Sequence, residues 1–144
     1  MKNNNLVNLE IFNRSVGILF GKLLETFPKR TEIIFNDLAI EIFDDDDDTE
    51  TYFDKHELFA ETTAWLERAG YIWASKIENY EAYDVVLTPM GLETMKHAPE
   101  ALTGKSIGEE ISSVIKSSVK ETAKSALTTI VSIALTEGYK VLSK

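Results

Sequence analysis

The sequence predicts a mainly α-helical fold that carries one small antiparallel β-hairpin, an α+β fold class. Apolar residues recur every three or four positions in several segments, which is the period of an amphipathic helix. Between residues 71 and 87 the spacing changes to that of β-strands, and a polar turn divides this region into two strands. Capping residues, glycines and prolines mark the ends of these segments, so each element can be assigned in order along the chain.

A first helix is predicted over residues 6–27. Pro28 ends this helix, because the residue before a proline is pushed out of the α-helical region. Gly17 and Gly21 lie inside the helix, where each costs about 1 kcal/mol relative to Ala. We therefore expect the helix to pack closely against another element at these two glycines. Its apolar stripe consists of Leu6, Leu9, Phe12, Val16, Leu19, Phe20, Leu23 and Phe27.

A second, shorter helix is predicted over residues 32–43, with Thr31 as its N-cap. It leads into the acidic run Asp44–Asp48, whose like charges repel one another and indicate a solvated loop. An EF-hand calcium loop that began at Asp44 would need Gly at its sixth position and Glu at its twelfth. Those positions hold Thr49 and Lys55, so the sequence predicts no specific calcium site here.

The third helix is predicted over residues 55–69, and the hairpin follows it. Asp54 is the expected N-cap, and Glu57 completes a capping box with it. Gly70 stands where a left-handed C-terminal cap belongs. The two hairpin strands are expected at residues 71–77 and 83–87.

A fourth helix is predicted directly after the hairpin. Thr88 is its expected N-cap, and Pro89 occupies the first helical position, where its missing N–H costs nothing. His97 and Pro99 are expected to end the helix.

The last segment, residues 106–143, is predicted to be a long amphipathic helix of about 35 residues, about 50 Å if unbroken. Clusters of Ser and Thr lower its helix propensity, so one helix and two helices both remain open. A single helix of this length would extend beyond a domain built from the preceding residues, and a second copy of the chain is the expected cover. We therefore predict a domain at 1–100, a helical oligomerisation segment at 101–144, and a homo-oligomer with a dimer favoured. The expected interface consists of Ile111, Ile115, Val119, Ala123, Ala126, Ile130, Ala134 and Gly138.

Residues around the hairpin resemble a known family. Residues 65–72 read Trp-Leu-Glu-Arg-Ala-Gly-Tyr-Ile, and residues 87–95 read Leu-Thr-Pro-Met-Gly-Leu-Glu-Thr-Met. With the predicted order of three helices, a hairpin and a helix, this pattern resembles bacterial and phage winged helix-turn-helix proteins over residues 6–97. The resemblance implies a third helix that enters the DNA major groove and a hairpin wing that contacts the adjacent backbone.

The charge pattern argues against DNA binding through that third helix. The net charge of the chain is −9, but residues 31–100 carry −14, whereas residues 1–30 carry +3 and residues 101–144 carry +2. Phosphate contacts are made mainly by Lys and Arg, so carboxylates on the third helix and wing would repel DNA. We expect this surface to be an acidic contact face for a protein partner. The expected face consists of Asp44, Asp46, Asp48, Glu57 and Glu61.

The sequence predicts no catalytic, metal-binding or cofactor-binding site. The chain has no Cys and two His, which excludes disulfides and thiolate sites and argues against a His-rich metal site. His56 is interpreted as a surface or cap residue, and His97 as a partner of a helix C-terminus. Gly104–Ser106 is similar to the end of a phosphate-binding loop, but Pro99 stands where its first glycine belongs. We therefore expect a protein that is not an enzyme.

Composition and hydropathy indicate a soluble protein. Of 144 residues, 44% are hydrophobic and 27% are charged, which is ordinary for one globular domain. The N-terminus lacks the apolar segment of a signal peptide. The longest uncharged stretch, residues 125–136, is shorter than the roughly 20 residues that a membrane-spanning helix needs. The expected location is the cytoplasm, with no membrane contact.

Three functions remain open on this basis. The first is a non-enzymatic protein–protein interaction module, built on a degenerate winged helix that self-associates through its last helix. The second is a DNA-binding transcriptional regulator that uses basic N- and C-terminal helices. The third is an inhibitor that mimics nucleic acid through rows of carboxylates. The basic patch that the second function requires consists of Lys22, Lys29, Arg30, Lys116, Lys120 and Lys124.

Overall fold

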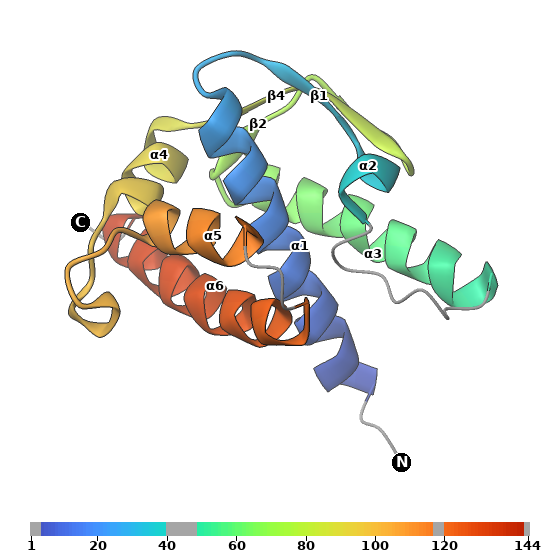
Figure 1. Ribbon diagram of the computed structural model, residues 1–144. Helices are drawn as coiled ribbons and strands as arrows, with labels where there is room; N and C mark the ends of the chain where they lie inside the picture. The colour runs from blue at the N-terminus through green and yellow to red at the C-terminus, as the bar shows by residue number, and fades with distance from the viewer. Residues whose placement is uncertain (1–3, 40–48, 117–119, 143–144) are drawn as a thin grey trace.

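The computed structural model describes residues 4–39, 49–116 and 120–142, and it has a mainly helical fold with a small antiparallel sheet (Figure 1). The predicted α+β class is therefore confirmed. The expected residues Asp44, Asp46, Asp48 and Val119 lie outside the described ranges. The elements are α1 (Asn4–Thr26), β1 (Thr31–Ile34), α2 (Phe35–Ala39), α3 (Thr49–Arg68), β2 (Ile72–Trp73), β3 (Lys76–Ile77), β4 (Glu81–Leu87), α4 (Pro89–Lys96), the short 3-10 helix η1 (Glu100–Leu102), α5 (Ile107–Lys116) and α6 (Lys120–Leu142).

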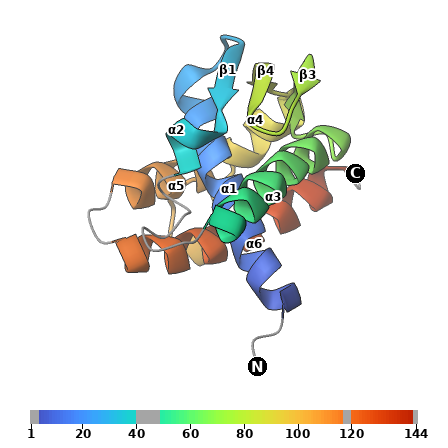
Figure 2. The same ribbon diagram turned by 90° about the vertical axis from the view of Figure 1, so that its right-hand side faces the viewer.

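Helix α1 runs through the middle of the molecule. It lies between α3 on one side and the pair α5 and α6 on the other, as Figures 1 and 2 show from two directions. Val16, Leu19, Phe20 and Leu23 are at most 1% exposed, so the predicted apolar stripe forms the centre of the core. Leu9 is 54% exposed, and this end of the stripe reaches the surface. The helix ends before Pro28, as its sequence predicts.

Two glycines of α1 mark the places where the C-terminal helices come close. A Cβ built on Gly17 would lie 2.7 Å from Leu127 Cδ2 on α6. A Cβ built on Gly21 would overlap Ile115 and lie 3.3 Å from Cγ2 of Ile111, both on α5. The prediction of close helix packing at Gly17 and Gly21 is confirmed, because side chains of α5 and α6 occupy the space that a Cβ at either position would need.

The segment after α1 differs from its prediction. A helix was expected over residues 32–43, but Thr31–Ile34 forms strand β1, and the short helix α2 begins only at Phe35. Strand β1 pairs with β4, antiparallel, through Ile33 opposite Ala82. Its run of β-branched residues favours an extended chain. Burial of Ile33, which is 1% exposed, adds tertiary packing that the local helical spacing does not reveal.

The hairpin forms with β4 as the central strand of the sheet, in the order β1-β4-β2. Strands β2 and β3 pair with β4 in one continuous register, so together they act as one interrupted strand. The interruption lies opposite Asp84, which adopts a left-handed conformation with φ of 53°. The Ser75 hydroxyl donates to Asp84 Oδ2 at 2.8 Å and bridges this gap.

Helix α3 ends as predicted but begins earlier than predicted. It starts at Thr49, so Asp54 lies inside the helix and is not its N-cap. At the other end, Gly70 has φ of 91°, and its N–H donates to Glu67 O. The Tyr71 N–H donates to Leu66 O at 2.9 Å, which completes a Schellman motif. The chain thereby turns directly from α3 into the sheet.

Helix α4 has the ends that its sequence predicts. The Thr88 hydroxyl accepts a hydrogen bond from the Gly91 N–H at 3.0 Å, and Pro89 occupies the first helical position. The helix ends at Lys96, and His97 is its C-cap. A Cβ on Gly91 would overlap the Tyr71 carbonyl oxygen, so this glycine lets α4 approach the start of the hairpin.

The C-terminal segment forms two helices, α5 and α6, which pack against each other and against α1. One hydrophobic cluster contains residues from α1, the sheet, α5 and α6. Helices α5 and α6 of the predicted segment at 101–144 therefore share one core with the predicted domain at 1–100. The long helix folds back, and its apolar stripe faces the same chain.

The residues of the predicted oligomer interface whose side chains the structure describes pack within the single chain. Ile111, Ile130, Ala134 and Gly138 are buried in the single chain, and Ile115 and Ala126 are partly buried against its core. These four residues are buried within the chain and are not exposed for contact with a second copy. Gly138 lies directly over the ring of Tyr71, which a Cβ at this position would overlap. The Ala123 side chain, like Val119, lies outside the described part.

Within the described residues, no helix combines the length and the apolar character that a transmembrane span requires.

Candidate binding surfaces

An aromatic groove lies between α1 and α3. Its volume is about 510 Å³, and Phe12 of α1 and Trp65 of α3 form its floor. Their rings meet edge to face with centroids 5.2 Å apart, and Trp65 also stacks on Tyr71 at 6.4 Å. Trp65 is nevertheless 39% exposed, and Leu9 on the groove edge is 54% exposed. The groove thus combines fixed rings with apolar surface that the chain itself leaves uncovered.

Two carboxylates of α3 lie at or beside this groove. Glu61 lines it directly, and Glu57 lies one turn earlier on the exposed face of α3. These are the two residues of the predicted acidic face that the structure describes. Glu10 of α1, whose carboxylate is exposed and lies 3.7 Å from Arg14, does not line the groove. Arg68 is the basic residue in the lining, so the groove edge has mixed charge with an excess of acid on α3.

A second groove, of about 600 Å³, lies between α1, α2 and α5. Lys22 and Lys116 line it, so the structure brings together two residues of the predicted basic patch. Lys29 and Arg30 are exposed in the turn after α1 and do not line this groove. The side chains of Lys120 and Lys124 lie outside the described part, so the patch as a whole is not assembled from described residues.

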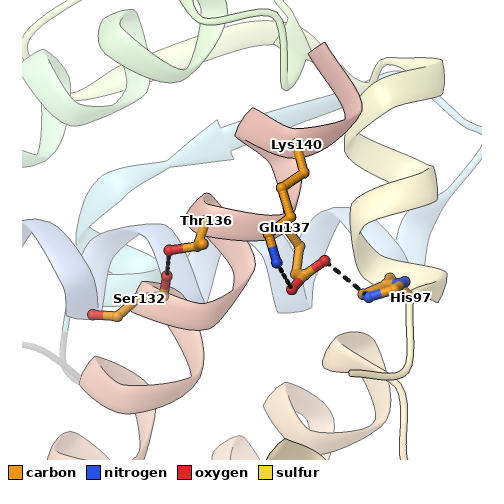
Figure 3. A network of polar contacts seen from close by, with 5 residues as sticks. All are labelled: His97, Ser132, Thr136, Glu137 and Lys140. Atoms are coloured by element: carbon orange, nitrogen blue, oxygen red, sulfur yellow. Dashed lines mark hydrogen bonds and ion pairs between the residues drawn. The ribbon is translucent and has the colours of Figure 1, made fainter. Parts of the chain in front are cut away.

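A third feature is a polar network between the end of α4 and helix α6 (Figure 3). Nε2 of His97 lies 2.9 Å from Glu137 Oε2, and Lys140 Nζ lies 3.3 Å from Glu137 Oε1. A hollow of about 670 Å³ adjoins these side chains. His97 therefore has a specific carboxylate partner. The sequence does not predict Glu137 as this partner, because the pair joins residues 40 positions apart.

The His97 network lacks the geometry of a nucleophilic catalytic site. The Thr136 hydroxyl donates to the Ser132 carbonyl oxygen at 2.9 Å. The Ser132 side chain points away from His97 in Figure 3. Nucleophilic catalysis requires a hydroxyl or thiol within hydrogen-bond reach of the base, and neither of these two hydroxyls meets that condition. The network acts as a link between α4 and α6.

His56 is not the surface or cap residue that its sequence context indicates. It lies inside α3, is 2% exposed, and its ring packs 5.3 Å from that of Tyr80. The neighbouring Lys55 is also buried, at 7% exposed. Because α3 begins six residues earlier than expected, this part of the sequence is a helix interior rather than a helix start.

A carboxylate pair lies at the edge of the sheet. A hydrogen bond that the protonated Glu32 carboxyl donates to Glu81, together with burial and the charge of Glu81, raises the pKa of Glu32 above its usual 4.5. A hydrogen bond to Glu81 raises the pKa of Tyr83 to about 12. Among the described residues, no group of three or more His, Asp or Glu side chains is placed to hold a metal ion.

Comparison with protein-family models, with curated proteins and with solved structures finds no match for this chain. The surfaces that bear on function are therefore the two grooves beside α1 and the His97 network.

Proposed function

We propose that this chain is a non-enzymatic protein-interaction module, built on a winged-helix-like scaffold, that uses the groove between α1 and α3 as its contact surface. The order of elements supports the scaffold: α1, β1, α2 and α3 precede a hairpin, and all pack on one core. The acidic outer face of α3 replaces the basic face that a DNA-reading helix presents. Self-association through α5 and α6 is not part of the proposal, because their apolar faces are buried.

One observation carries this proposal: apolar side chains are exposed around a groove that has carboxylates along its α3 side, where Arg68 is the one basic residue of the lining. Trp65 and Leu9 are 39% and 54% exposed, and Glu57 and Glu61 lie beside them on α3. Aromatic residues in partly desolvated positions often dominate binding energy, and charges on the rim steer and select the partner. The complementary partner is an amphipathic helix with an apolar stripe and basic flanks.

A synthetic amphipathic helix made of Leu and Lys tests this proposal. We expect a labelled peptide of this type to bind the full chain, as measured by fluorescence anisotropy. The substitution Trp65→Ala should weaken binding by about tenfold or more, in the range of an interface hot spot. Tyr139→Ala is the matched control, because Tyr139 is an aromatic residue on α6 that is 71% exposed and lies outside the groove.

The charge half of the proposal has its own test. We expect Glu57→Gln combined with Glu61→Gln to reduce peptide affinity and to reduce its dependence on salt, because fewer screened charges contribute. Equal affinity of wild type, Trp65→Ala and Tyr139→Ala would place binding elsewhere on the molecule. Tight, salt-dependent binding of random duplex DNA at about 50 mM salt would instead favour the regulator function.

A further inference from the structure

The groove between α1, α2 and α5 has a different character from the groove proposed as the protein contact. Ile18, Leu24, Leu38 and Ile115 supply its apolar lining. At Gly21 the Ile115 side chain packs directly on α1, since a Cβ there would overlap Ile115. Its volume of about 600 Å³ falls within the range of small-molecule sites, which are mostly apolar with a few convergent polar groups.

Two ammonium groups stand at this groove. Lys22 comes from α1 and Lys116 from the last turn of α5. Within the part of the chain that the structure describes, neither lysine forms an ion pair. Glu25 is the one carboxylate in the lining, so the lining carries a net positive charge. The groove is complementary to an anion attached to an apolar body.

A neighbouring hollow of about 450 Å³ extends this groove along α5. The two share Leu24, Ser112 and Lys116. Helix α5 has ten residues, which corresponds to a length of about 15 Å. The charged groups at the far end are already engaged: Lys96 lies 3.8 Å from Glu93, and Glu109 accepts a hydrogen bond from the Ser106 N–H. The combined surface is therefore elongated, with its available positive charge near Lys116.

We propose that this groove binds a carboxylate with an unbranched alkyl chain of medium length. The alkyl chain would lie over Leu24 and Ile115 along α5, and the carboxylate would lie between Lys22 and Lys116. Duplex DNA would use the lysines but not the apolar lining, and for that reason the lining favours an amphiphile over a polyanion. This inference is independent of the proposed protein contact, because Lys22 and Lys116 do not line the α1–α3 groove.

Decanoate is the ligand for the test, with methyl NMR spectra of the full chain as the readout. We expect saturable shifts of the Ile18 and Ile115 methyl signals. Lys22→Gln combined with Lys116→Gln should weaken decanoate binding by about tenfold, as the loss of two partly exposed ion pairs predicts. Lys29→Gln combined with Arg30→Gln removes the same charge outside the groove and should leave affinity unchanged.

Two further measurements test the site: decanoate binding to a variant with a blocked groove, and binding of an uncharged analogue. Ser112→Phe places a ring in the half-buried position that both hollows share, and it should abolish binding while the melting temperature stays within a few degrees of wild type. Decanol, which lacks the charge, should bind more weakly than decanoate. The inference is overturned if decanoate does not bind, if decanol binds equally well, if the Lys22/Lys116 variant keeps wild-type affinity, or if duplex DNA displaces decanoate.

Discussion

The two grooves that flank helix α1 are built by opposite means. On the α3 side, rings fill the space between the helices, and Phe12 and Trp65 meet edge to face at 5.2 Å. On the α5–α6 side, Gly17 and Gly21 remove side chains so that the helices approach closely. The first arrangement leaves aromatic surface exposed beside carboxylates, and the second leaves an apolar recess beside lysines. Helix α1 thus presents two chemically different surfaces: aromatic rings where it packs on α3, and glycines where it packs on α5 and α6.

The largest expected effect contrasts two rings of α3 that differ in burial. Phe59 is fully buried against Phe35, with centroids 4.7 Å apart, whereas Trp65 is 39% exposed. Phe59→Ala should lower the free energy of unfolding by about 3–5 kcal/mol through lost burial and cavity formation. Trp65→Ala should lower the free energy of unfolding clearly less in chemical denaturation, although it should weaken peptide binding by about tenfold or more. Equal losses of stability would mean that Trp65 serves the core and not a contact surface.

A substitution at Gly17, where α1 packs against α6, should have an intermediate effect on the free energy of unfolding. Gly17→Val would place a β-branched side chain against Leu127 and Val131 of α6. We expect a loss of about 1–3 kcal/mol from overpacking, measured by urea denaturation. Glu10→Val puts the same side chain on an exposed position of the same helix, and it should change stability by about 0.5 kcal/mol or less. A harmless Gly17→Val would contradict close packing between α1 and α6.

A smaller effect concerns the carboxylate pair at the sheet edge. Because the folded-state pKa of Glu32 is raised, its favourable contribution is present below its usual value of 4.5 and is lost as pH rises through the raised pKa. At pH 7 the ionised Glu32 repels Glu81. Glu32→Gln should therefore raise the melting temperature at pH 7, and this advantage should shrink as the pH is lowered through the folded-state pKa. If the higher melting temperature of Glu32→Gln did not depend on pH, this would contradict a Glu32 pKa that Glu81 raises.

At the start of α5, the corresponding substitution is expected to lower the melting temperature and not to raise it. Hydrogen bonds from Ser106 lower the pKa of Glu109, and the two residues form a reciprocal capping box. The contribution of Glu109 is present above the usual pKa of 4.5 and is lost as pH falls through the lowered value. Glu109→Gln should slightly lower the melting temperature at pH 7, and wild type and variant should converge in acid. A constant difference across this range would exclude the charged cap.

Local chemistry allowed much of the fold to be predicted from sequence. Pro28, Gly70 and Thr88 act on their own backbone neighbourhood, and the structure confirms each helix end that they predict. Strand β1 was missed because Ile34, Leu38 and Ile42 have a helical spacing in the sequence, whereas Thr31–Ile34 forms a strand by pairing with β4. The start of α3 was placed too late because Asp54 has the chemistry of a cap without occupying that position.

The surfaces were harder to predict because they depend on contacts between distant segments. The repeat that ends in Ala134 and Gly138 has the spacing of an oligomer interface, but α5 and α6 fold back so that it covers α1 and Tyr71 instead. Glu57 and Glu61 were predicted as contact residues from charge alone. Trp65 was not among the predicted contact residues, since helical spacing does not reveal that this residue stays 39% exposed.

The most direct test of a contact surface between α1 and α3 is the affinity of the Leu/Lys peptide for the Leu9→Ala variant. This affinity is compared with that of wild type and of Tyr139→Ala. Leu9 belongs to α1 and Trp65 to α3, so a loss at both positions would locate the contact in the groove between them. We predict that Leu9→Ala and Trp65→Ala each weaken binding while Tyr139→Ala does not. Unchanged affinity in Leu9→Ala and Trp65→Ala would contradict a contact surface between α1 and α3.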